Sequence, residues 1–354
     1  MNDVRAMLVD TATRIFQDRC KLETISAAEE GVWPAELWQA LEETGLTLAG
    51  VPEDSGGSGG SLGDSLAIMQ AAGRFAAPVP LAETALAAWL LSSAGLAVPT
   101  GPLTVAPVLP GDELELRRDG AGWTLFGSAA RVPWARAAER IAVLARSADG
   151  PMVASVAASA CPLAPGVNVA GEPRDAVAFD GVTVATAEAA LAPAGLDSQA
   201  LRARGALTRV LLGAGALEQA LELTVTYATD RTQFGRPISR FQVIQQQLAV
   251  FAAEVAATSA AAAAAAEAAE HGDALLEIAA AKIRFGEAAS TTGAIAHQVH
   301  GAIGFTQEHA LHLTTRRLWA WRDEFGGEAE WAALLGERLA AGGPEALWSF
   351  ITGD

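Results

Sequence analysis

The chain has 354 residues, enough for two or three domains with buried cores. Its formal net charge of −17 and isoelectric point near 4.7 repel polyanions, so nucleic acid and anionic membranes are not expected as partners. No uncharged apolar run reaches the length of a membrane span, and the stretch MNDVRAMLVDTATRIF lacks the apolar core of a signal peptide. Cys20 and Cys161 cannot build a disulfide framework. We therefore expect a cytoplasmic protein without a membrane partner.

Residues 1–98 predict a helical N-terminal domain. The segment AELWQALEETGL places Leu37, Trp38 and Leu41 near helical spacing, and Gly45 supplies a stop signal. Residues 99–193 then change to the alternation of β-strands. ELELRRDGAGWTLFG predicts a hairpin with an Asp-Gly turn, RIAVLARSADGPMVASVA a second hairpin, and DAVAFDGVTVA a third. These features favour a small antiparallel β domain.

Helical periodicity returns from residue 194 to residue 354. One apolar face is formed by Val210, Leu211, Ala214, Leu217 and Leu221, on a helix that ends near Asp230. Another face is formed by Phe241, Ile244, Leu248, Phe251 and Val255, and alanine-rich sequence continues that helix to a break at Gly272. Small residues let helices approach closely, as in a tight bundle or an oligomer core.

The stretch DRTQFGRPISRFQVIQ, residues 230–245, joins these two helices. An arginine is favourable at a helix C-terminus, Gly235 permits a tight turn, and Pro237 suits the start of the next helix. These features need no ligand, but they do not explain Gln233 and Phe234, whose exposure would be costly. Arginine is also the usual side chain for binding phosphate in a bidentate manner. The stretch is therefore either a helix connection or a phosphate site.

A second stretch, HQVHGAIGFTQEHALH, spans residues 297–312 and holds four of the five histidines. Its two histidine pairs are spaced three residues apart, but Glu308 is the only carboxylate among them and the spacing is not that of a zinc protease. We therefore predict no metal site. Gly301 and Gly304 are more informative, because a glycine at a helix end lets a ligand approach the backbone.

YATDRTQFGRPISRFQVIQQQLA and QVHGAIGFTQEHALH together resemble the two C-terminal signatures of the acyl-CoA dehydrogenase family, and LWQALEETGLTLAGVPEDSGGSGG resembles its early helix and Pro-Glu-x-x-Gly-Gly segment. The resemblance covers essentially the whole chain. It implies an α+β, mostly α fold: an N-terminal helical domain (1–98), a middle antiparallel β domain (99–193) and a C-terminal four-helix bundle (194–354). It also implies FAD, an acyl-CoA substrate that loses hydrogen from its α and β carbons, an electron-transfer flavoprotein or similar acceptor, and a tetramer of paired dimers.

The resemblance further implies a set of residues that bind the FAD of a neighbouring subunit. In the first signature these are Arg231 and Phe234, with Ile238 and Phe241 nearby. In the second signature, which closes over the adenosine-diphosphate part, they are Gln298, His300 and Gly301. Ala302 stands where the family often has a second glycine.

The residues that would hold the chain's own flavin depart from the family pattern. The Thr/Ser-Glu and Gly-Ser-Asp segments that hold the ring and substrate are missing from LSSAGLAVPTGPLTVAPVLPGDELEL. The strand that often supplies an aromatic side chain beside the flavin contains Arg131 roughly at that place, with Trp134 three residues on. The flavin site of this chain is therefore in question, whereas the residues offered to a neighbour are intact.

The catalytic base departs as well. Removing an α-proton beside a thioester needs a carboxylate close to that carbon in a dry site. In most of the family this glutamate precedes a glycine after the second signature, where this chain has Phe325 and Gly326. A one-residue slip would make Glu324 the base, and the alternative is an ordinary helix-surface carboxylate. Some members carry the glutamate early in the helix before the first signature, where this chain has Gly205 and Ala206.

Four functions fit these observations. The first is an acyl-CoA dehydrogenase that works alone as a homo-oligomer. The second is one subunit of a two-chain dehydrogenase, as in family members acting on bulky substrates such as steroid side-chain thioesters, with the base on the partner. The third is a non-catalytic scaffold, and the fourth a flavin monooxygenase-type member of the same fold. We favour the dehydrogenase chemistry and leave its solo and paired versions open.

Overall fold

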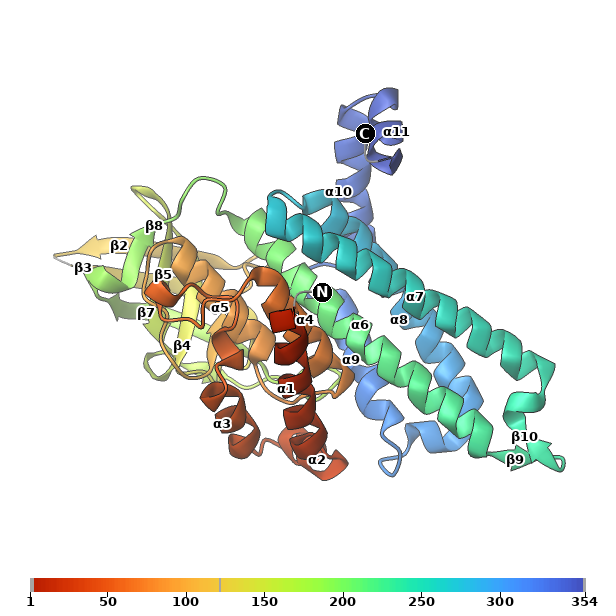
Figure 1. Cartoon of the computed structure of the whole chain (residues 1–354). Helices are drawn as coiled ribbons and strands as arrows, with labels where there is room; N and C mark the ends of the chain where they lie inside the picture. The colour runs from red at the N-terminus through yellow and green to blue at the C-terminus, as the bar shows by residue number, and fades with distance from the viewer. Residues whose placement is uncertain (1–2, 121, 353–354) are drawn as a thin grey trace.

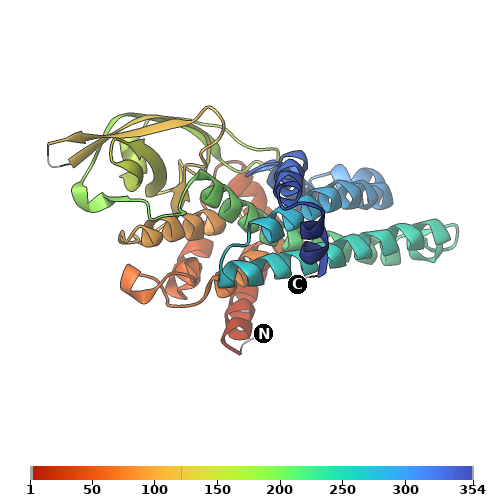
Figure 2. The ribbon, with the colours of Figure 1, turned by 90° about the horizontal axis from the view of Figure 1, so that it is seen from above.

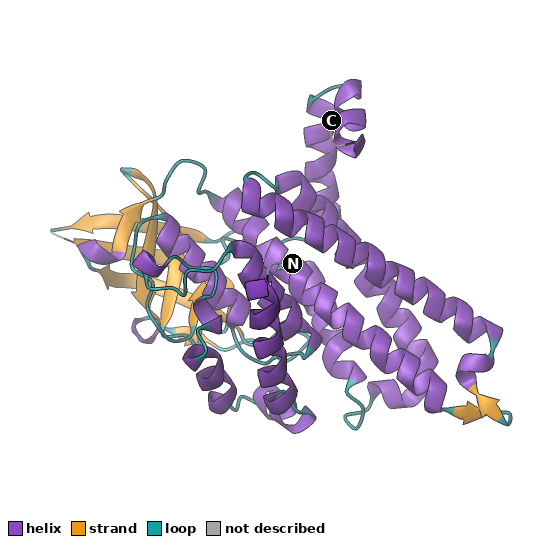
Figure 3. Cartoon of the chain, in the orientation of Figure 1, coloured by secondary structure: helices purple, strands orange, loops and turns teal. Residues whose placement is uncertain are grey.

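The computed structural model describes residues 3–120 and 122–352. An eight-stranded sheet lies at one end, and a bundle of long helices extends away from it (Figures 1 and 3). Seen from above, the sheet and the far end of the bundle are at opposite ends of the molecule (Figure 2). The predicted α+β, mostly α fold class is confirmed.

The N-terminal part is helical because its apolar residues recur at helical spacing. Its elements are α1 (Asp3–Arg19), α2 (Leu22–Glu29), α3 (Ala35–Glu43), η1 (Leu46–Leu48), η2 (Glu53–Ser55), α4 (Leu62–Arg74) and α5 (Leu81–Ser93). In α3, Leu37, Trp38 and Leu41 are buried as predicted, and Gly45 follows with a φ of 70°. The hydroxyl of Ser61 caps α4 by accepting a hydrogen bond from the Asp64 N–H.

The sheet follows in the chain. Its strands are β1 (Leu103–Val105), β2 (Glu113–Asp119), β3 (Gly122–Pro133), β4 (Arg140–Ser147), β5 (Gly150–Ala157), β6 (Leu163–Ala164), β7 (Arg174–Val184) and β8 (Ala189–Leu191). Short helices η3 (Ala158–Ala160) and η4 (Thr186–Glu188) lie between them. The strand order is β6-β7-β3-β2-β4-β5-β8, with β1 beside β4.

Two expectations about this sheet need correction. The hairpins β2–β3 and β4–β5 are confirmed, but the sheet is mixed because β1 and β2 both pair with β4 in parallel. The third hairpin is wrong, since β7 runs as a single strand. Asp180 and Gly181 make a bulge against β3 rather than a turn, with Gly181 at a φ of 75°.

The C-terminal part is a helical bundle followed by two projecting helices. It comprises α6 (Ser198–Asp230), β9 (Thr232–Gln233), β10 (Arg236–Pro237), η5 (Ile238–Arg240), α7 (Gln242–His271), α8 (Leu275–His300), η6 (Gly301–Phe305), α9 (Leu311–Asp323), α10 (Glu328–Ala341) and α11 (Pro344–Thr352). Helix α6 packs against α7, α8 and α9. The approach is close, since a Cβ built at Gly213 of α6 would lie 2.1 Å from the Phe285 ring of α8.

Among the described residues, α7 alone is long and apolar enough to cross a membrane by length and composition. Glu254 and Glu267 interrupt its sequence, so no uncharged run spans it. The helix packs against α6 and α8 in the bundle, and 28% of its apolar window is buried within the chain. One such helix is weak evidence for a membrane.

Candidate functional site

The two C-terminal signatures meet at the far end of the bundle. Tyr227, in the last turn of α6, stacks on His300, the last residue of α8, with 4.5 Å between ring centroids. The β9–β10 hairpin that follows α6 and the η6 turn that follows α8 therefore lie at the same end (Figure 1). The fold thus brings together two segments that the sequence separates by about sixty residues.

The first signature forms a tight hairpin that exposes an aromatic side chain. Phe234 and Gly235 have φ values of 53° and 77°. The Phe234 side chain is 91% exposed, and its ring meets that of Phe241 edge-on at 6.1 Å. Positive φ is unfavourable for a bulky residue, and the exposed ring gains little from packing in this chain. Ile238 and Phe241 are half-buried behind it.

Arg231 is fixed through its backbone while its side chain is free. Its N–H donates to the Tyr227 carbonyl at 2.9 Å, and its carbonyl accepts from the Ile238 N–H at 2.8 Å. Among the described residues, no carboxylate forms an ion pair with its exposed guanidinium. The hairpin therefore presents a cation and an aromatic ring to anything that docks at this end.

The second signature divides into exposed and buried residues. Gln298 and Gly301 are exposed, and Gly301 ends α8 with a φ of 64°. His300 is only 3% exposed, and its Nδ1 lies 2.8 Å from the Ala296 carbonyl. Its side chain packs between Tyr227 and His309 instead of facing outward. His300 therefore supports the turn at Gly301 through these contacts, and its assignment to the cofactor site stays a prediction.

The neighbouring histidines also pack against rings. His297 stacks on Phe305 at 4.1 Å, and its Nε2 lies 3.0 Å from the Thr315 hydroxyl. Burial lowers the pKa of His297, His300 and His309, which favours their neutral forms. No group of three His, Cys, Asp or Glu side chains within the described part of the chain is arranged to hold a metal.

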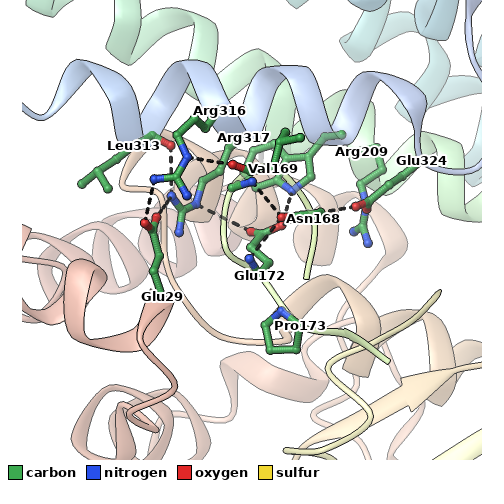
Figure 4. A network of polar contacts seen from close by, with 12 residues as sticks. Glu29, Asn168, Val169, Glu172, Pro173, Arg209, Leu313, Arg316, Arg317 and Glu324 are labelled. Carbon is green, nitrogen blue, oxygen red and sulfur yellow. Dashed lines mark hydrogen bonds and ion pairs between the residues drawn. The ribbon is translucent and has the colours of Figure 1, made fainter. Parts of the chain in front are cut away.

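Glu324 lies in a buried ion-pair network at the C-terminus of α9 (Figure 4). Its carboxylate accepts hydrogen bonds from Arg174 at 2.8 and 2.9 Å, from Arg209 at 2.7 Å and from Asn168 at 3.1 Å. Burial alone would raise the pKa of Glu324, but the charges of Arg174 and Arg209 outweigh it and lower the pKa to about 2. A carboxylate held in this way is a poor proton acceptor near neutral pH, so Glu324 does not fit the role of base.

The network continues beyond Glu324 and joins all three parts of the chain. Its further ion pairs are Arg209–Glu83 at 2.6 Å, Arg174–Glu172 at 3.0 Å, Arg317–Glu29 at 3.0 Å and Arg316–Glu29 at 2.9 Å. These residues come from α2, α5, the segment before β7, β7 itself, α6 and α9. Sequence reasoning missed the network, because apart from Arg174–Glu172 its paired residues lie more than a hundred positions apart.

Phe325 occupies the place where the family resemblance puts the base. Its φ is 57°, it is 7% exposed, and its ring packs directly on α6. A Cβ built at Gly205 would lie 2.3 Å from that ring, so Gly205 is needed for the contact. The two alternative positions of the family's glutamate therefore face each other here, and an aromatic ring fills the space between them.

Two adjoining cavities lie beside the Phe325 ring. Arg131 and Pro133, at the end of β3, face Glu324 and Phe325 across a cavity of about 50 Å³. Small-molecule sites usually measure roughly 300–1,000 Å³. Trp134 instead lines a separate cavity of about 650 Å³ between the α2–α3 turn and the sheet. A third cavity, of about 420 Å³, adjoins the first one and is lined by Phe325, Leu109 and Arg202 among others. What the structure shows at the family's base position is a phenylalanine ring in place of a carboxylate, whereas the exposed set at the far end of the bundle remains compatible with a flavin.

The two regions are also too far apart to serve one ring. Arg209 and Arg231 lie on or at the end of the same helix, 22 residues apart. At 1.5 Å per residue the separation along the axis is about 33 Å. A flavin that contacts the residues at the far end of the bundle would therefore be one held by another chain.

The comparisons with known proteins identify the family. The model described as "Acyl-CoA dehydrogenase, C-terminal domain" matches residues 200–330, and "Acyl-CoA dehydrogenase, N-terminal domain" matches residues 2–97. The chain belongs to the acyl-CoA dehydrogenase family. It is a flavin-dependent oxidoreductase of acyl-CoA thioesters, acting alone or as one subunit of a two-chain enzyme.

Its relatives show how diverged the chain is. The acyl-CoA dehydrogenase IpdE2 of Mycolicibacterium smegmatis is 28% identical over 324 residues, which are 90% of this chain and 93% of the relative. The ChsE4-ChsE5 complex from Mycobacterium tuberculosis matches with a TM-score of 0.87 at 23% identity, over 96% of this chain and 98% of the matched one. The Tcur3481-Tcur3483 steroid ACAD matches with a TM-score of 0.86 at 27% identity, over the same shares. The prediction of a diverged member is confirmed.

Proposed function

We propose that this chain is the complementing subunit of a two-chain, FAD-dependent acyl-CoA dehydrogenase. In this arrangement the partner chain holds the FAD and supplies the base, and this chain completes the cofactor site from outside. When bound, FAD would supply the acceptor for the hydride that leaves the β carbon of the acyl group, and the partner's base would take the α-proton. The contribution of this chain is to bind and orient the cofactor with residues at the far end of its bundle.

The observation that carries the proposal is the filled space at Phe325. A proton acceptor is absent from both Phe325 and Gly205, and Glu324 is held by Arg174 and Arg209. The cavity that Glu324 lines is only about 50 Å³, so little room remains beside that carboxylate. These features support a chain that relies on its partner for the reacting centre.

The exposed residues at the opposite end support the complementary half of the proposal. Arg231 would pair with a phosphate of the partner's FAD, and the Phe234 ring would cover part of the cofactor. Gln298 and Gly301 would approach the adenosine-diphosphate part, with Ile238 and Phe241 backing the hairpin. Only 28% of the apolar window of α7 is buried within the chain, so this helix offers a broad face of small residues to another subunit.

The relatives guide the choice of substrate and partners. The names of the two structural relatives each join two chains, and one is called a steroid ACAD. We therefore assign a bulky, steroid-derived acyl-CoA as substrate, a heterotetramer as the assembly, an electron-transfer flavoprotein or similar protein as acceptor, and the cytoplasm as location.

The proposal is tested by purifying the chain alone and together with a second dehydrogenase chain encoded beside it. Alone, the protein should be colourless after incubation with FAD. The co-purified complex should be yellow and should bleach with the acyl-CoA under nitrogen. Arg231→Ala should lower the FAD content of that complex, whereas Arg240→Ala, an exposed arginine three residues beyond the hairpin, should leave it unchanged.

Other outcomes would select the competing functions. A yellow homo-oligomer that bleaches with an acyl-CoA would establish the solo dehydrogenase. A complex that stays colourless with every candidate partner would indicate the non-catalytic scaffold. A complex that converts its substrate only in the presence of oxygen would favour the monooxygenase-type function.

A further inference from the structure

A cavity between the α2–α3 turn and the sheet lies apart from the flavin position. It measures about 650 Å³, within the range of roughly 300–1,000 Å³ that small-molecule sites occupy. It shares no lining residue with the two cavities beside Phe325, and the proposed function gives it no role. The cavity therefore has the size of a separate ligand site.

Three tryptophans line this cavity. The rings of Trp33 and Trp38 meet at an angle of 49°, with 5.8 Å between their centroids. Trp38 is 4% exposed, and its Nε1 has no hydrogen-bond partner among the described residues, so a buried donor lacks an acceptor. Trp134 follows β3, and its N–H donates to the Pro173 carbonyl at 3.0 Å. Indole rings from two parts of the chain therefore form apolar walls.

Two of the charged side chains at the cavity are neutralised by their own partners. Glu29 pairs with Arg316 at 2.9 Å and with Arg317 at 3.0 Å. The Nε of Arg136, the cation that lines the cavity, lies 3.0 Å from Asp175 Oδ1. Arg136 is therefore already engaged and does not balance the other carboxylates at the cavity.

Three further carboxylates line the cavity without an ion pair in the described part of the chain: Glu30, Glu42 and Glu139. Glu42 accepts a hydrogen bond from the Gly101 N–H at 2.9 Å. Gly101 has a φ of 89°, and a Cβ built on it would lie 2.6 Å from the Glu139 carboxylate carbon. Glu42 and Glu139 therefore both lie against Gly101, where their like charges repel and a cation would stabilise them.

The chemistry of the walls selects the kind of cation. Within the described residues, no group of three His, Cys, Asp or Glu side chains is arranged to hold a metal ion. Indole faces instead attract ammonium groups through cation–π interactions, and they pack against alkyl groups on the nitrogen. The net charge of −17 on the chain raises the local concentration of any such cation.

We propose that this cavity binds a small organic cation whose charged nitrogen carries alkyl groups. The indole rings pack against the alkyl groups, and Glu42 and Glu139 balance the charge. This inference goes beyond the proposed function and does not rest on it, because it concerns neither the flavin nor the acyl-CoA thioester.

The test compares choline with 3,3-dimethylbutan-1-ol, in which carbon replaces the charged nitrogen. Choline carries the alkylated ammonium, and its hydroxyl oxygen is an acceptor of the kind that the Trp38 N–H lacks. Isothermal titration calorimetry of the full chain at constant ionic strength should show saturable binding of choline and much weaker binding of the neutral alcohol. Equal affinities for the two compounds, or no saturable binding of choline, would overturn the proposal.

Carboxylate variants test where choline binds. In the double variant Glu42→Gln/Glu139→Gln the affinity for choline should fall about tenfold or more, because both balancing charges are lost. The double variant Glu43→Gln/Glu113→Gln removes the same net charge from exposed glutamates that do not line the cavity, and it should keep the affinity. An equal loss in both double variants would show only a general effect of net charge and would contradict the assignment.

An aromatic variant separates a ligand role from a structural one. Trp33→Leu should lower the affinity for choline about fivefold, as expected for losing one cation–π contact. Trp33→Tyr keeps an aromatic face and should restore most of it. The Tm of each variant is measured alongside, and an affinity that follows the Tm instead of the aromatic face would overturn the role of Trp33 as a cavity wall for the cation.

Discussion

The two ends of α6 treat the arginine side chain in opposite ways. Near its beginning, Arg209 is 1% exposed, and its carboxylate partners Glu83 and Glu324 are 5% and 12% exposed. At its end, Arg231 is exposed without an ion pair in the described chain, beside a phenylalanine ring that is 91% exposed. The first region satisfies its charges within the chain and the second does not. The difference indicates that the Arg209 region is complete within the folded chain, whereas the Arg231 region is available to bind another molecule.

Glu324→Gln should have the largest effect on the free energy of unfolding, because it removes the carboxylate from the ion-pair network around Arg209. Arg174 and Arg209 would lose the charge that balances them in a buried site, which costs about 3–5 kcal/mol. The free energy of unfolding in urea should fall by that amount at neutral pH. Glu330→Gln, which removes a more exposed carboxylate paired with Arg202, should cost about 1 kcal/mol or less.

The same variant makes a pH prediction. In the unfolded chain Glu324 titrates near 4.5, whereas the folded network lowers its pKa to about 2. Its contribution to stability is therefore fully present above pH 4.5 and is lost as the pH falls toward 2. The stability gap between the unchanged protein and Glu324→Gln should narrow over that window. A gap that stays constant down to pH 2 would contradict the ion-pair assignment.

Gly205→Ala should have the next largest effect. The added methyl group would meet the Phe325 ring at 2.3 Å, and such overpacking costs about 1–3 kcal/mol. Adding Phe325→Leu, which shortens the side chain, should make the two changes non-additive in a double-mutant cycle. Additive losses of unfolding free energy would show that the ring does not rest on Gly205. Gly336→Ala, at a helix position with open space beyond it, is the control.

The contrast between the two ends also explains what sequence could predict. The far end is built from contiguous residues, so its hairpin and the glycine at the end of α8 are visible as motifs. The ion-pair network is not, because Glu324 meets Arg174 and Arg209 across 150 and 115 positions. Only the fold determines which charges are paired, so the sequence alone could not tell whether Glu324 is a base or an ion-pair partner.

Local periodicity failed in a second, smaller way. The sequence DAVAFDGVTVA carries an Asp-Gly pair that favours a turn, yet Arg174–Val184 is one strand because pairing with β3 overrides the turn. The resemblance places His300 among the cofactor-binding residues without saying how its side chain is packed. Its burial against Tyr227 depends on how α6 and α8 pack, which no spacing within α8 reveals.

His300 lies at the same end of the bundle as Arg231 but is buried, so its effect on stability can be measured in the isolated chain. Burial lowers the pKa of His300 in the folded chain. Below about pH 6.5 the imidazole therefore takes up a proton in the unfolded chain while it stays neutral in the folded one. Stability should therefore fall as the pH drops below 6.5. In His300→Phe, which keeps a ring against Tyr227, this fall should be shallower in urea titrations from pH 7.5 to 5.5. His297 and His309 should preserve part of it.

Phe234→Ala should have the smallest effect on the free energy of unfolding of the isolated chain. The exposed ring contributes little packing, so the free energy of unfolding should change by about 0.5 kcal/mol or less. In the two-chain complex the same change should weaken FAD retention, measured as flavin absorbance after gel filtration, because the ring would then cover the cofactor. Glu324→Gln, by contrast, should lower the free energy of unfolding both in the isolated chain and in the two-chain complex. If Phe234→Ala instead destabilised the isolated chain as much as Glu324→Gln, the hairpin would be part of the folded core, and the distinction between the two ends of α6 would fail.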